Sequence, residues 1–186
     1  MSTITTLGLV ELNSVAKGIL TCDTMVKKAD VELIEAYPVC PGKYVIIISG
    51  DVAAVENAVH AGIAAAESNF IDQMVLPRVH DQIIPGLLGT SQILDIQAIG
   101  ILETFSVAST LIAADTSLKA SHVHILEIRL AKGLGGKSFF TITGTVANVT
   151  AAIEAGSHII AKDGILVNKE IIPDPHPSLK QQLLEW

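Results

Sequence analysis

The sequence predicts an α/β (α+β) fold, built as a tandem duplication of a ferredoxin-like βαββαβ unit. Two observations carry this prediction. The chain of 186 residues repeats itself at a spacing of about 90 residues, and each copy reads as strand, helix, two strands, helix and strand. A chain of this length suits either one good core or two small ones, and the repeat favours two.

The two copies align with shifts that fall only in loops. "LGLVELNSVAKGIL" from residue 7 matches "IGILETFSVASTLI" from residue 99, and ten of the 33 positions from Leu7 to Val39 are identical to their counterparts 92 residues later. "KYVIIISGDVAAV" then matches "KSFFTITGTVANV" at an offset of 94, and "LPRVH" faces "IPDPH". We therefore predict two domains, 1–92 and 93–186, joined near "GLLGTSQILDIQ" at 86–97.

Each element of the unit has its own signal in the first copy. The apolar run at 7–12 predicts a buried strand, and Ser14 predicts the N-cap of a helix with apolar residues at helical spacing. Residues 30–39 alternate between apolar and polar, which is typical of a half-buried strand. Residues 44–50 predict an apolar strand, Asp51 the N-cap of an Ala-rich helix, and 71–79 the closing strand. The second copy repeats this order from Ile99 to Ile172.

Composition narrows the function classes. A net charge of −7 and 4% aromatic residues argue against nucleic acid as a partner. The longest charge-free stretch, 138–153, is too short and too polar to span a membrane. The start of the chain has neither a basic segment nor a cleavable apolar run, so we expect no signal peptide and a cytoplasmic protein. No nucleophile–base pair, carboxylate dyad or cofactor fingerprint appears, so we do not expect an enzyme.

The stretch "AYPVCPGKY", residues 36–44, places one of only two cysteines on a stiff loop. Pro38 and Pro41 restrict the backbone on both sides of Cys40, and Gly42 permits close packing of the backbone. Lys43 brings positive charge that would favour a thiolate. By itself, such a residue is an ordinary loop thiol.

The other cysteine, Cys22, is a different case. It lies on the apolar face of the first predicted helix and aligns with Ala114 of the second copy. A position that accepts alanine in the sister unit predicts a small buried core residue rather than a ligand. Two cysteines also make no disulfide framework, which favours a reducing compartment.

Several motifs together resemble the bacterial microcompartment shell proteins: "DTMVKKADV", "SGDVAAVENAV", "LPRVH" and "IPDPH". The resemblance covers nearly the whole chain twice, in the unpermuted tandem class. "VCPGKY" and "GLGGKSFF" closely resemble the corresponding loops of a shell protein of propanediol-utilisation compartments. The resemblance implies a structural subunit of a microcompartment shell, a homotrimer that imitates a hexamer, with other shell proteins as neighbours.

The resemblance also implies a cofactor. In the relatives that this loop resembles, its cysteine binds a 4Fe–4S cluster at the threefold axis, so Cys40 from each of three chains would supply three ligands and leave one iron without a protein ligand. Lys43 would then offset part of the charge of an anionic cluster, and Gly42 would permit close approach of another chain. The loops implied at the axis contain Pro38, Val39, Pro41, Gly42 and Lys43 in the first copy and Gly133, Leu134, Gly135 and Gly136 in the second.

The role of such a cluster stays open from the sequence. It would move electrons across the shell or be delivered to a redox enzyme in the lumen. The alternative is a purely structural tile whose Cys40 lines a metabolite pore. A soluble enzyme or small-molecule sensor on the same scaffold is a weaker third interpretation.

Contacts at the edge of the tile follow from the resemblance as well. The family's edge lysine matches Lys27 and Lys119, and its edge arginine matches Arg78. Asp174 stands at the arginine's place in the second copy, and a carboxylate lacks the forked donors of a guanidinium. His80 and His176 end the two closing motifs and are expected to make edge contacts.

Overall fold

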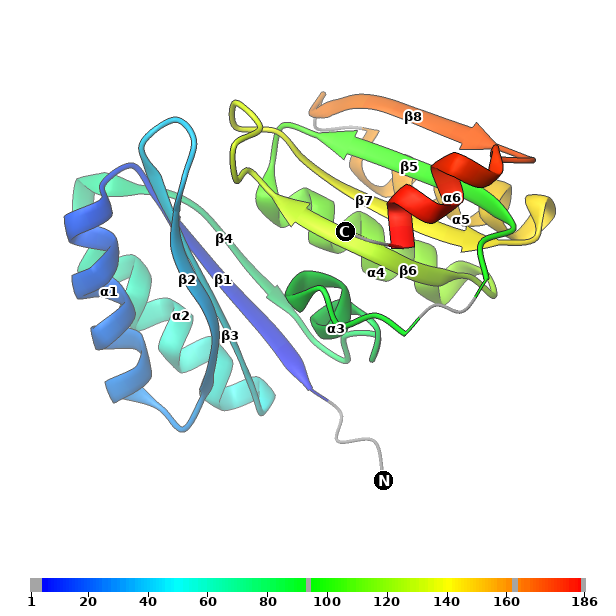
Figure 1. Cartoon of the computed structure of the whole chain (residues 1–186). Coiled ribbons are helices and arrows are strands. Elements are labelled where there is room, and N and C mark those ends of the chain that lie inside the picture. The colour runs from blue at the N-terminus through cyan, green and yellow to red at the C-terminus, as the bar shows by residue number, and fades with distance from the viewer. Residues whose placement is uncertain (1–4, 93–94, 162–163, 185–186) are drawn as a thin grey trace. The chain divides into compact units, whose positions relative to one another are not determined.

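The computed structural model describes residues 5–92, 95–161 and 164–184, which form two compact units that divide between Val79 and His80 (Figure 1). The first unit follows the predicted order. Its elements are β1 (Thr6–Leu12), α1 (Val15–Lys28), β2 (Glu32–Val39), β3 (Lys43–Gly50), α2 (Val52–Ala66), a 3-10 turn (Glu67–Asn69) and β4 (Phe70–Leu76).

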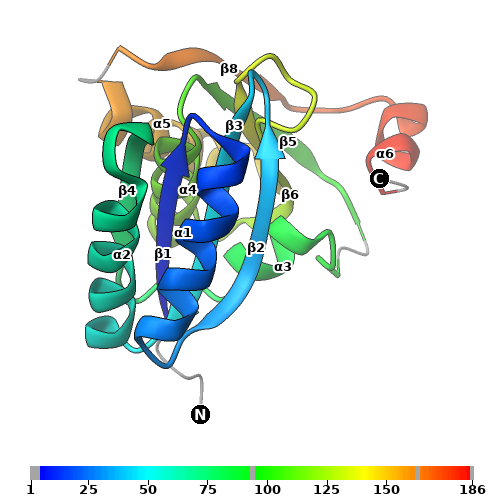
Figure 2. The same ribbon diagram turned by 90° about the vertical axis from the view of Figure 1, so that its left-hand side faces the viewer.

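The sheet of the first unit has the strand order β2-β3-β1-β4, with every neighbouring pair antiparallel. Helices α1 and α2 lie side by side on one face of this sheet (Figure 2). Strand β1 is central and buried along its whole length, as its apolar run predicts. The predicted βαββαβ unit is therefore confirmed for the first copy.

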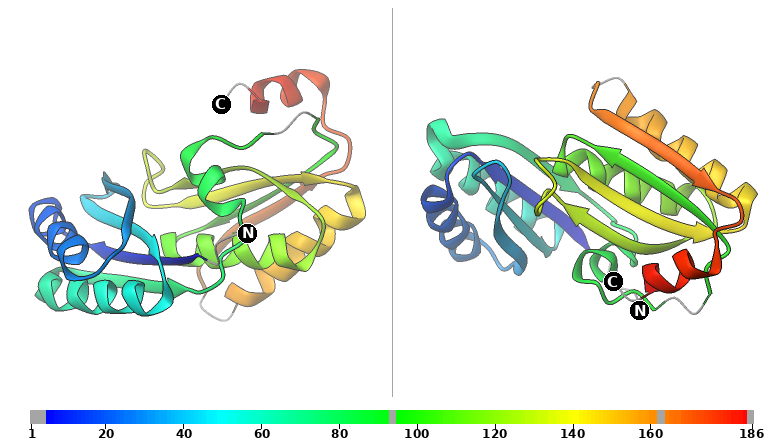
Figure 3. Two further views of the ribbon diagram at one scale, coloured as in Figure 1. Left: turned by 90° about the horizontal axis from the view of Figure 1, so that it is seen from below. Right: turned by 45° about the horizontal axis from the view of Figure 1, so that its top comes forward.

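The second unit repeats this architecture and adds a helix at each end (Figure 3). Its sheet has the order β6-β7-β5-β8, again antiparallel throughout, so the tandem duplication is confirmed. Its elements are α3 (Ile83–Leu88), β5 (Ala98–Thr104), α4 (Val107–Ala120), β6 (His124–Leu130), β7 (Ser138–Gly144), α5 (Val146–Ile160), β8 (Leu166–Ile172) and α6 (Pro177–Leu184).

The short helix α3 moves the division between the units away from the predicted boundary at 92/93. Helix α3 extends to Leu88 and so includes the start of the segment expected as a linker, and Ile83, the first residue of α3, is fully buried. Gly86 lies so close to β6 that a β-carbon there would be 3.0 Å from Ile125 Cγ2. Because this packing ties the segment to the second unit, the compact units separate between Val79 and His80. Residues 93 and 94 lie outside the described part of the chain.

Three of the four long helices begin with a side-chain cap. Ser14 accepts a hydrogen bond from Lys17 N at 3.3 Å, and its counterpart Ser106 caps α4 in the same way. Asp51 stands at the N-cap of α2 as predicted, but its side chain makes no capping hydrogen bond. Thr145 at the equivalent place does cap α5.

Small residues let the helices lie close to the sheets and to each other. A β-carbon on Gly8 would lie 2.6 Å from Val55 Cγ1, and one on Gly100 would lie 2.7 Å from Val149 Cγ1. Both glycines are central in their sheets and identical in the repeat, so the sequence retains glycine where the second helix crosses the first strand. Cys22 lies on the buried face of α1 and packs in the hydrophobic core, which confirms its predicted place.

Within the described ranges, no helix combines the length and apolarity needed to cross a bilayer.

The contact between α4 and α5 should tolerate an added methyl group less well than the contact between α1 and α2. In Gly156→Ala of α5, the new β-carbon would meet the backbone oxygen of Ala113 at 2.8 Å, whereas in Gly62→Ala of α2 it would meet the flexible end of Met25. We expect Gly156→Ala to lower the free energy of unfolding by about 1–3 kcal/mol and Gly62→Ala to change it by less than about 1 kcal/mol. Urea denaturation of both variants measures this, and equal losses would contradict it.

Candidate functional site

The hairpin between β2 and β3 presents Cys40 at its tip. Val39 and Lys43 face each other as the last pair of the ladder, and Cys40, Pro41 and Gly42 form the turn between them. Cys40 is exposed, whereas Val39 just before it is buried. The Cys40–Pro41 peptide bond is cis, and Gly42 has a φ of 69°, in the left-handed region that glycine favours.

The base of this hairpin is fixed by an aromatic contact with α1. Tyr44, the second residue of β3, is buried against Gly18, and a β-carbon on Gly18 would lie 2.5 Å from the ring. Burial, with a smaller contribution from the nearby Cys22 thiolate, raises the pKa of the Tyr44 phenol above its ordinary value. The tip thus carries an accessible thiol on an anchored base.

The equivalent loop of the second unit carries glycines in place of the thiol. Gly133, Gly135 and Gly136 all have positive φ, between 62° and 89°. Leu134 is half-buried between them, and its carbonyl accepts a hydrogen bond from Lys137 N at 3.2 Å. A chain can approach this loop closely because Gly133 and Gly135 have nothing within 4 Å of where a side chain would begin.

Lys43, which lies close to Cys40 in the sequence, forms an ion pair with a carboxylate. Its Nζ lies 2.9 Å from Oε1 of Glu11, a buried carboxylate of β1. A buried carboxylate needs a partner, and Lys43 supplies it. The expectation that Lys43 would favour a thiolate or offset a cluster is therefore weakened, because Glu11 already balances this charge. The second unit has the same arrangement, with Lys137 Nζ 2.6 Å from Glu103 Oε1.

Only Cys40 of the two thiols is positioned to bind a ligand. Burial, and secondly the neighbouring Asp23 carboxylate, raise the pKa of the Cys22 thiol above its ordinary value. Within the described residues of one chain, no three or more His, Cys, Asp or Glu side chains gather in a way that could hold a metal ion. A metal site that uses Cys40 would therefore draw its ligands from several chains.

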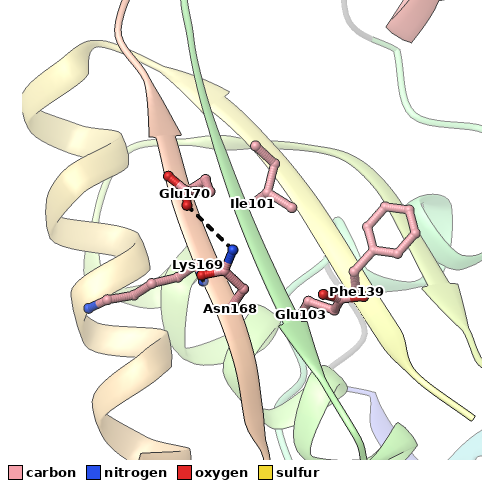
Figure 4. Close-up of a pocket in the computed structure, with 6 residues that line it drawn as sticks. All are labelled: Ile101, Glu103, Phe139, Asn168, Lys169 and Glu170. Carbon is pink, nitrogen blue, oxygen red and sulfur yellow. Dashed lines mark hydrogen bonds between the residues drawn. The ribbon is translucent and has the colours of Figure 1, made fainter.

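A shallow hollow lies on the second sheet (Figure 4). Ile101, Phe139 and Glu170 line it, and Asn168 donates a hydrogen bond to Glu170 at 3.4 Å. Lys169 extends toward α5 instead, where its Nζ lies 2.7 Å from Glu154. The hollow combines apolar walls with two carboxylates, and nothing in it matches a catalytic constellation.

The edge lysines predicted from the sequence lie on equivalent helices in unequal surroundings. Lys27 is exposed and bonds Asp23 at 2.7 Å. Lys119 bonds Asp115 at 2.5 Å, and this carboxylate is buried. The same i,i+4 pair is therefore solvated in the first unit and half-buried in the second.

The remaining predicted edge residues lie after the closing strands. Arg78 is exposed, with a φ of 53°, and Asp174 is exposed at the corresponding place. His80 makes contacts within its own unit: its backbone N donates to Asp115 at 2.8 Å, and its Nδ1 accepts from Gln82 N. His176 is exposed.

Two residues of this region were missed by sequence reasoning. Glu11 and Glu103 are the partners of the lysines that open β3 and β7. The repeat contains a signal for these pairs, because both the glutamate and the lysine are identical in the two copies. An acidic residue in an otherwise buried strand requires a cation nearby, and the lysine that begins the adjacent strand lies within reach.

Comparison with known families and proteins agrees with this geometry. The BMC domain family matches the chain twice, over residues 6–79 and 98–175. The bacterial microcompartment shell protein PduT of Citrobacter freundii is 38% identical, over 96% of this chain and 97% of its own length.

Solved structures show the same fold. A microcompartment protein from Desulfitobacterium hafniense superposes with a TM-score of 0.93 at 47% identity, covering 96% of this chain and 99% of that one. The fused permuted hexameric shell protein MSM0275 from the RMM microcompartment shares the fold alone, with a TM-score of 0.64 at 18% identity over 87% of this chain and 86% of its own.

The unequal burial of the two Lys–Glu pairs makes a testable difference. In Lys43→Met the carboxylate of Glu11, which is 5% exposed, loses its partner, and we expect about 2 kcal/mol less free energy of unfolding. In Lys137→Met the partner Glu103 is 28% exposed and water replaces the amine, so we expect less than about 1 kcal/mol. Chemical denaturation at neutral pH distinguishes the two, and equal losses would show that burial of Glu11 is unimportant.

The two thiols should differ in reactivity. Alkylation requires the thiolate, so the raised pKa of Cys22 lowers its reactive fraction at any given pH, and its burial limits access further. At pH 8 we expect iodoacetamide to modify one thiol per native chain rapidly, at Cys40, and Cys22 only after denaturation. Mass mapping of the modified peptides checks this. Rapid native labelling of Cys22 at pH 8 would contradict the assignment.

Proposed function

The chain belongs to the BMC domain family and is a structural subunit of a bacterial microcompartment shell, and we propose that three copies form a pseudohexameric tile that binds one 4Fe–4S cluster through Cys40. The observation that carries this proposal is the single exposed thiol per chain, set at the tip of an anchored hairpin.

The number of ligands supports a shared site. An iron–sulfur cluster is held by four ligands, most often thiolates, and one chain offers one accessible thiol. Three chains around a threefold axis offer three, and the fourth iron then takes a ligand that is not from the protein. Thiolates are also the donors that iron–sulfur clusters prefer, so the residue type fits the group.

The hairpin suits a site assembled from separate chains. Val39 is buried and Tyr44 is packed on Gly18, so the base of each hairpin is held while Cys40 remains exposed. Ordering a flexible loop costs about 1–2 kcal/mol per residue, and a tip that is already ordered avoids much of that cost when three sulfurs gather. The glycine-rich loop around Gly135 allows close approach beside it.

A cluster at this place would exchange single electrons. Its proposed role is electron transfer across the shell, with delivery of the cluster to a lumen redox enzyme as the second possibility. The two differ in whether iron leaves the tile when a cluster-free acceptor protein is added. The chain's own part is non-catalytic in either role: Cys40 holds the cluster, and the two sheets support the tile.

The exposed edge residues support contacts with other shell proteins. Lys27 and Arg78 of the first unit are both exposed and available to a neighbouring tile. The second unit presents Lys119 with Asp174 in place of the arginine. Since the arginine's forked donors are missing there, we propose that alternate edges of the tile differ in strength or in partner.

The test is iron and acid-labile sulfide per chain, measured in protein purified and reconstituted without oxygen. We expect about four-thirds of an iron per chain in the wild type, because one four-iron cluster serves three chains. Cys40→Ser should lose the iron and keep the trimer. Cys22→Ala is the matched control, since the second unit already has alanine there, and it should keep both.

Two results would count against the proposal. Iron that persists in Cys40→Ser would place the cluster elsewhere. Absence of iron and sulfide from reconstituted wild type would leave a structural tile whose "PVCPG" loop lines an opening.

A further inference from the structure

The segment that follows the first closing strand belongs to the second unit and packs against α4 and β6 of that unit. His80 N donates to the buried carboxylate of Asp115 on α4, and Gln82 Oε1 accepts from Ile125 N on β6 at 2.9 Å. Ile83 is fully buried, and Gly86 lies directly against Ile125. This docking covers the outer edge of the sheet at β6, the strand that has only one neighbour in it.

The segment that follows the second closing strand has the same local structure. His176 Nδ1 accepts from Ser178 N at 3.2 Å, as His80 Nδ1 accepts from Gln82 N at 3.3 Å. Leu179 N donates to His176 O, as Ile83 N donates to His80 O. The apolar residues Leu179, Leu183 and Leu184 of α6 repeat the positions of Ile83, Leu87 and Leu88. Helix α6 is therefore formed like α3, yet none of its residues is buried, and it stands clear of α4 and α5 (Figure 3).

The first unit has the matching surface in an exposed state. Leu33 corresponds to Ile125, and it is 44% exposed where Ile125 is 1% exposed. The side chain of Asp23 corresponds to that of Asp115, and it is 53% exposed where Asp115 is 5% exposed. Among its described hydrogen bonds, Asp23 has only the one from Lys27, whereas Asp115 accepts from Lys119 and also from His80 N.

The exposed surface continues along α1. Val15 and Ile19 lie on the same helical stripe as Asp23, and Ile19 is 57% exposed while its counterpart Leu111 is fully buried. Single exposed apolar residues are ordinary, but a run of them beside an open sheet edge is typical of an interaction surface.

Side-chain sizes are also compatible with docking of α6 on a first unit in the way that α3 packs on the second unit. In the second unit Gly86 packs against two isoleucines, Ile125 and Ile128. In the first unit the larger Gln182 would take the place of Gly86, and Ala36 stands where Ile128 stands. The added bulk on the helix is thus offset by bulk removed from the strand.

We propose that α6 of one chain docks on the β2 edge and α1 of a second copy, in the way that α3 docks on β6 and α4. His176 N then donates to Asp23, and Leu179 is buried beside Leu33. Each chain covers the β2 edge of one neighbour and offers its own β2 edge to another, and with the threefold rotation of the proposed trimer this head-to-tail repetition closes into a ring. This inference rests on the proposed trimer and names the contact that holds it.

A disulfide tests the contact directly. Because Gly86 touches Ile125, the pair Gln182→Cys and Leu33→Cys comes within disulfide reach across two chains, in a Cys40→Ser background. Under mild oxidation we expect covalent dimers and trimers on non-reducing gels, and neither single cysteine alone should give them. A disulfide formed only within one chain, or no disulfide in an intact trimer, would overturn the proposal.

Two leucines of α6 provide a matched pair for a second measurement. Leu179 corresponds to the buried Ile83, whereas Leu184 and its counterpart Leu88 are each 48% exposed. Leu179→Asp should raise the concentration at which the trimer half-dissociates by about tenfold or more, and Leu184→Asp should leave it within about twofold. Equal effects of the two variants would overturn the docking mode.

Failure of this inference is distinguishable from failure of the proposed function. If wild type has the native mass of a single chain, the trimer itself is wrong. If wild type is a trimer with iron and both docking experiments fail, the cluster proposal stands, and α6 is not the element that holds the ring together.

Discussion

One exposed thiol per chain is the constraint on which the account of this protein depends. Fe–S clusters need several thiolates, and the described residues of one chain bring together no alternative ligand set. The proposed cluster chemistry at Cys40 is therefore coupled to assembly, since a monomer presents one loop thiol and the proposed trimer would present three. The anchoring of the hairpin by Val39 and Tyr44 matters for the same reason, because an ordered tip reduces the entropy lost when three chains meet.

The two copies share a fold and differ in what they present to solvent. The strand order, the helix N-caps at Ser14 and Ser106, and the Lys–Glu pairs are common to both. The loop tips differ, with a cysteine in one copy and glycines in the other, and so do the outer edges, where Leu33 is open and Ile125 is covered. Because the two copies present different loop tips and edges, the proposed three-chain tile would have threefold rather than sixfold chemistry.

Much of the fold could be predicted from the sequence because its signals are local. The apolar strands, the caps and the repeat fix the order of elements in both units. The helix α3 could not be found in this way, since "IIPGLL" contains a proline and a glycine and is stabilised by tertiary contacts, the burial of Ile83 and the packing of Gly86 against β6. The same contact moved the division of the units from the predicted 92/93 to 79/80.

The site was predictable in part for the same reason. The exposure of Cys40 follows from its place between two prolines and a glycine in a turn. The partner of Lys43 does not follow, because Glu11 is 32 residues away in the chain and meets Lys43 only through the antiparallel pairing of β1 with β3. Long-range pairs of this kind become visible in sequence only through the repeat, which retains both members.

The central claim, that assembly creates the cluster site, is tested most directly by native mass spectrometry of protein reconstituted without oxygen. The account predicts one dominant species of three chains carrying one four-iron, four-sulfide cluster, and a cluster-free species of the same three-chain mass for Cys40→Ser. A cluster on a single chain, or three clusters on a trimer, would contradict the claim.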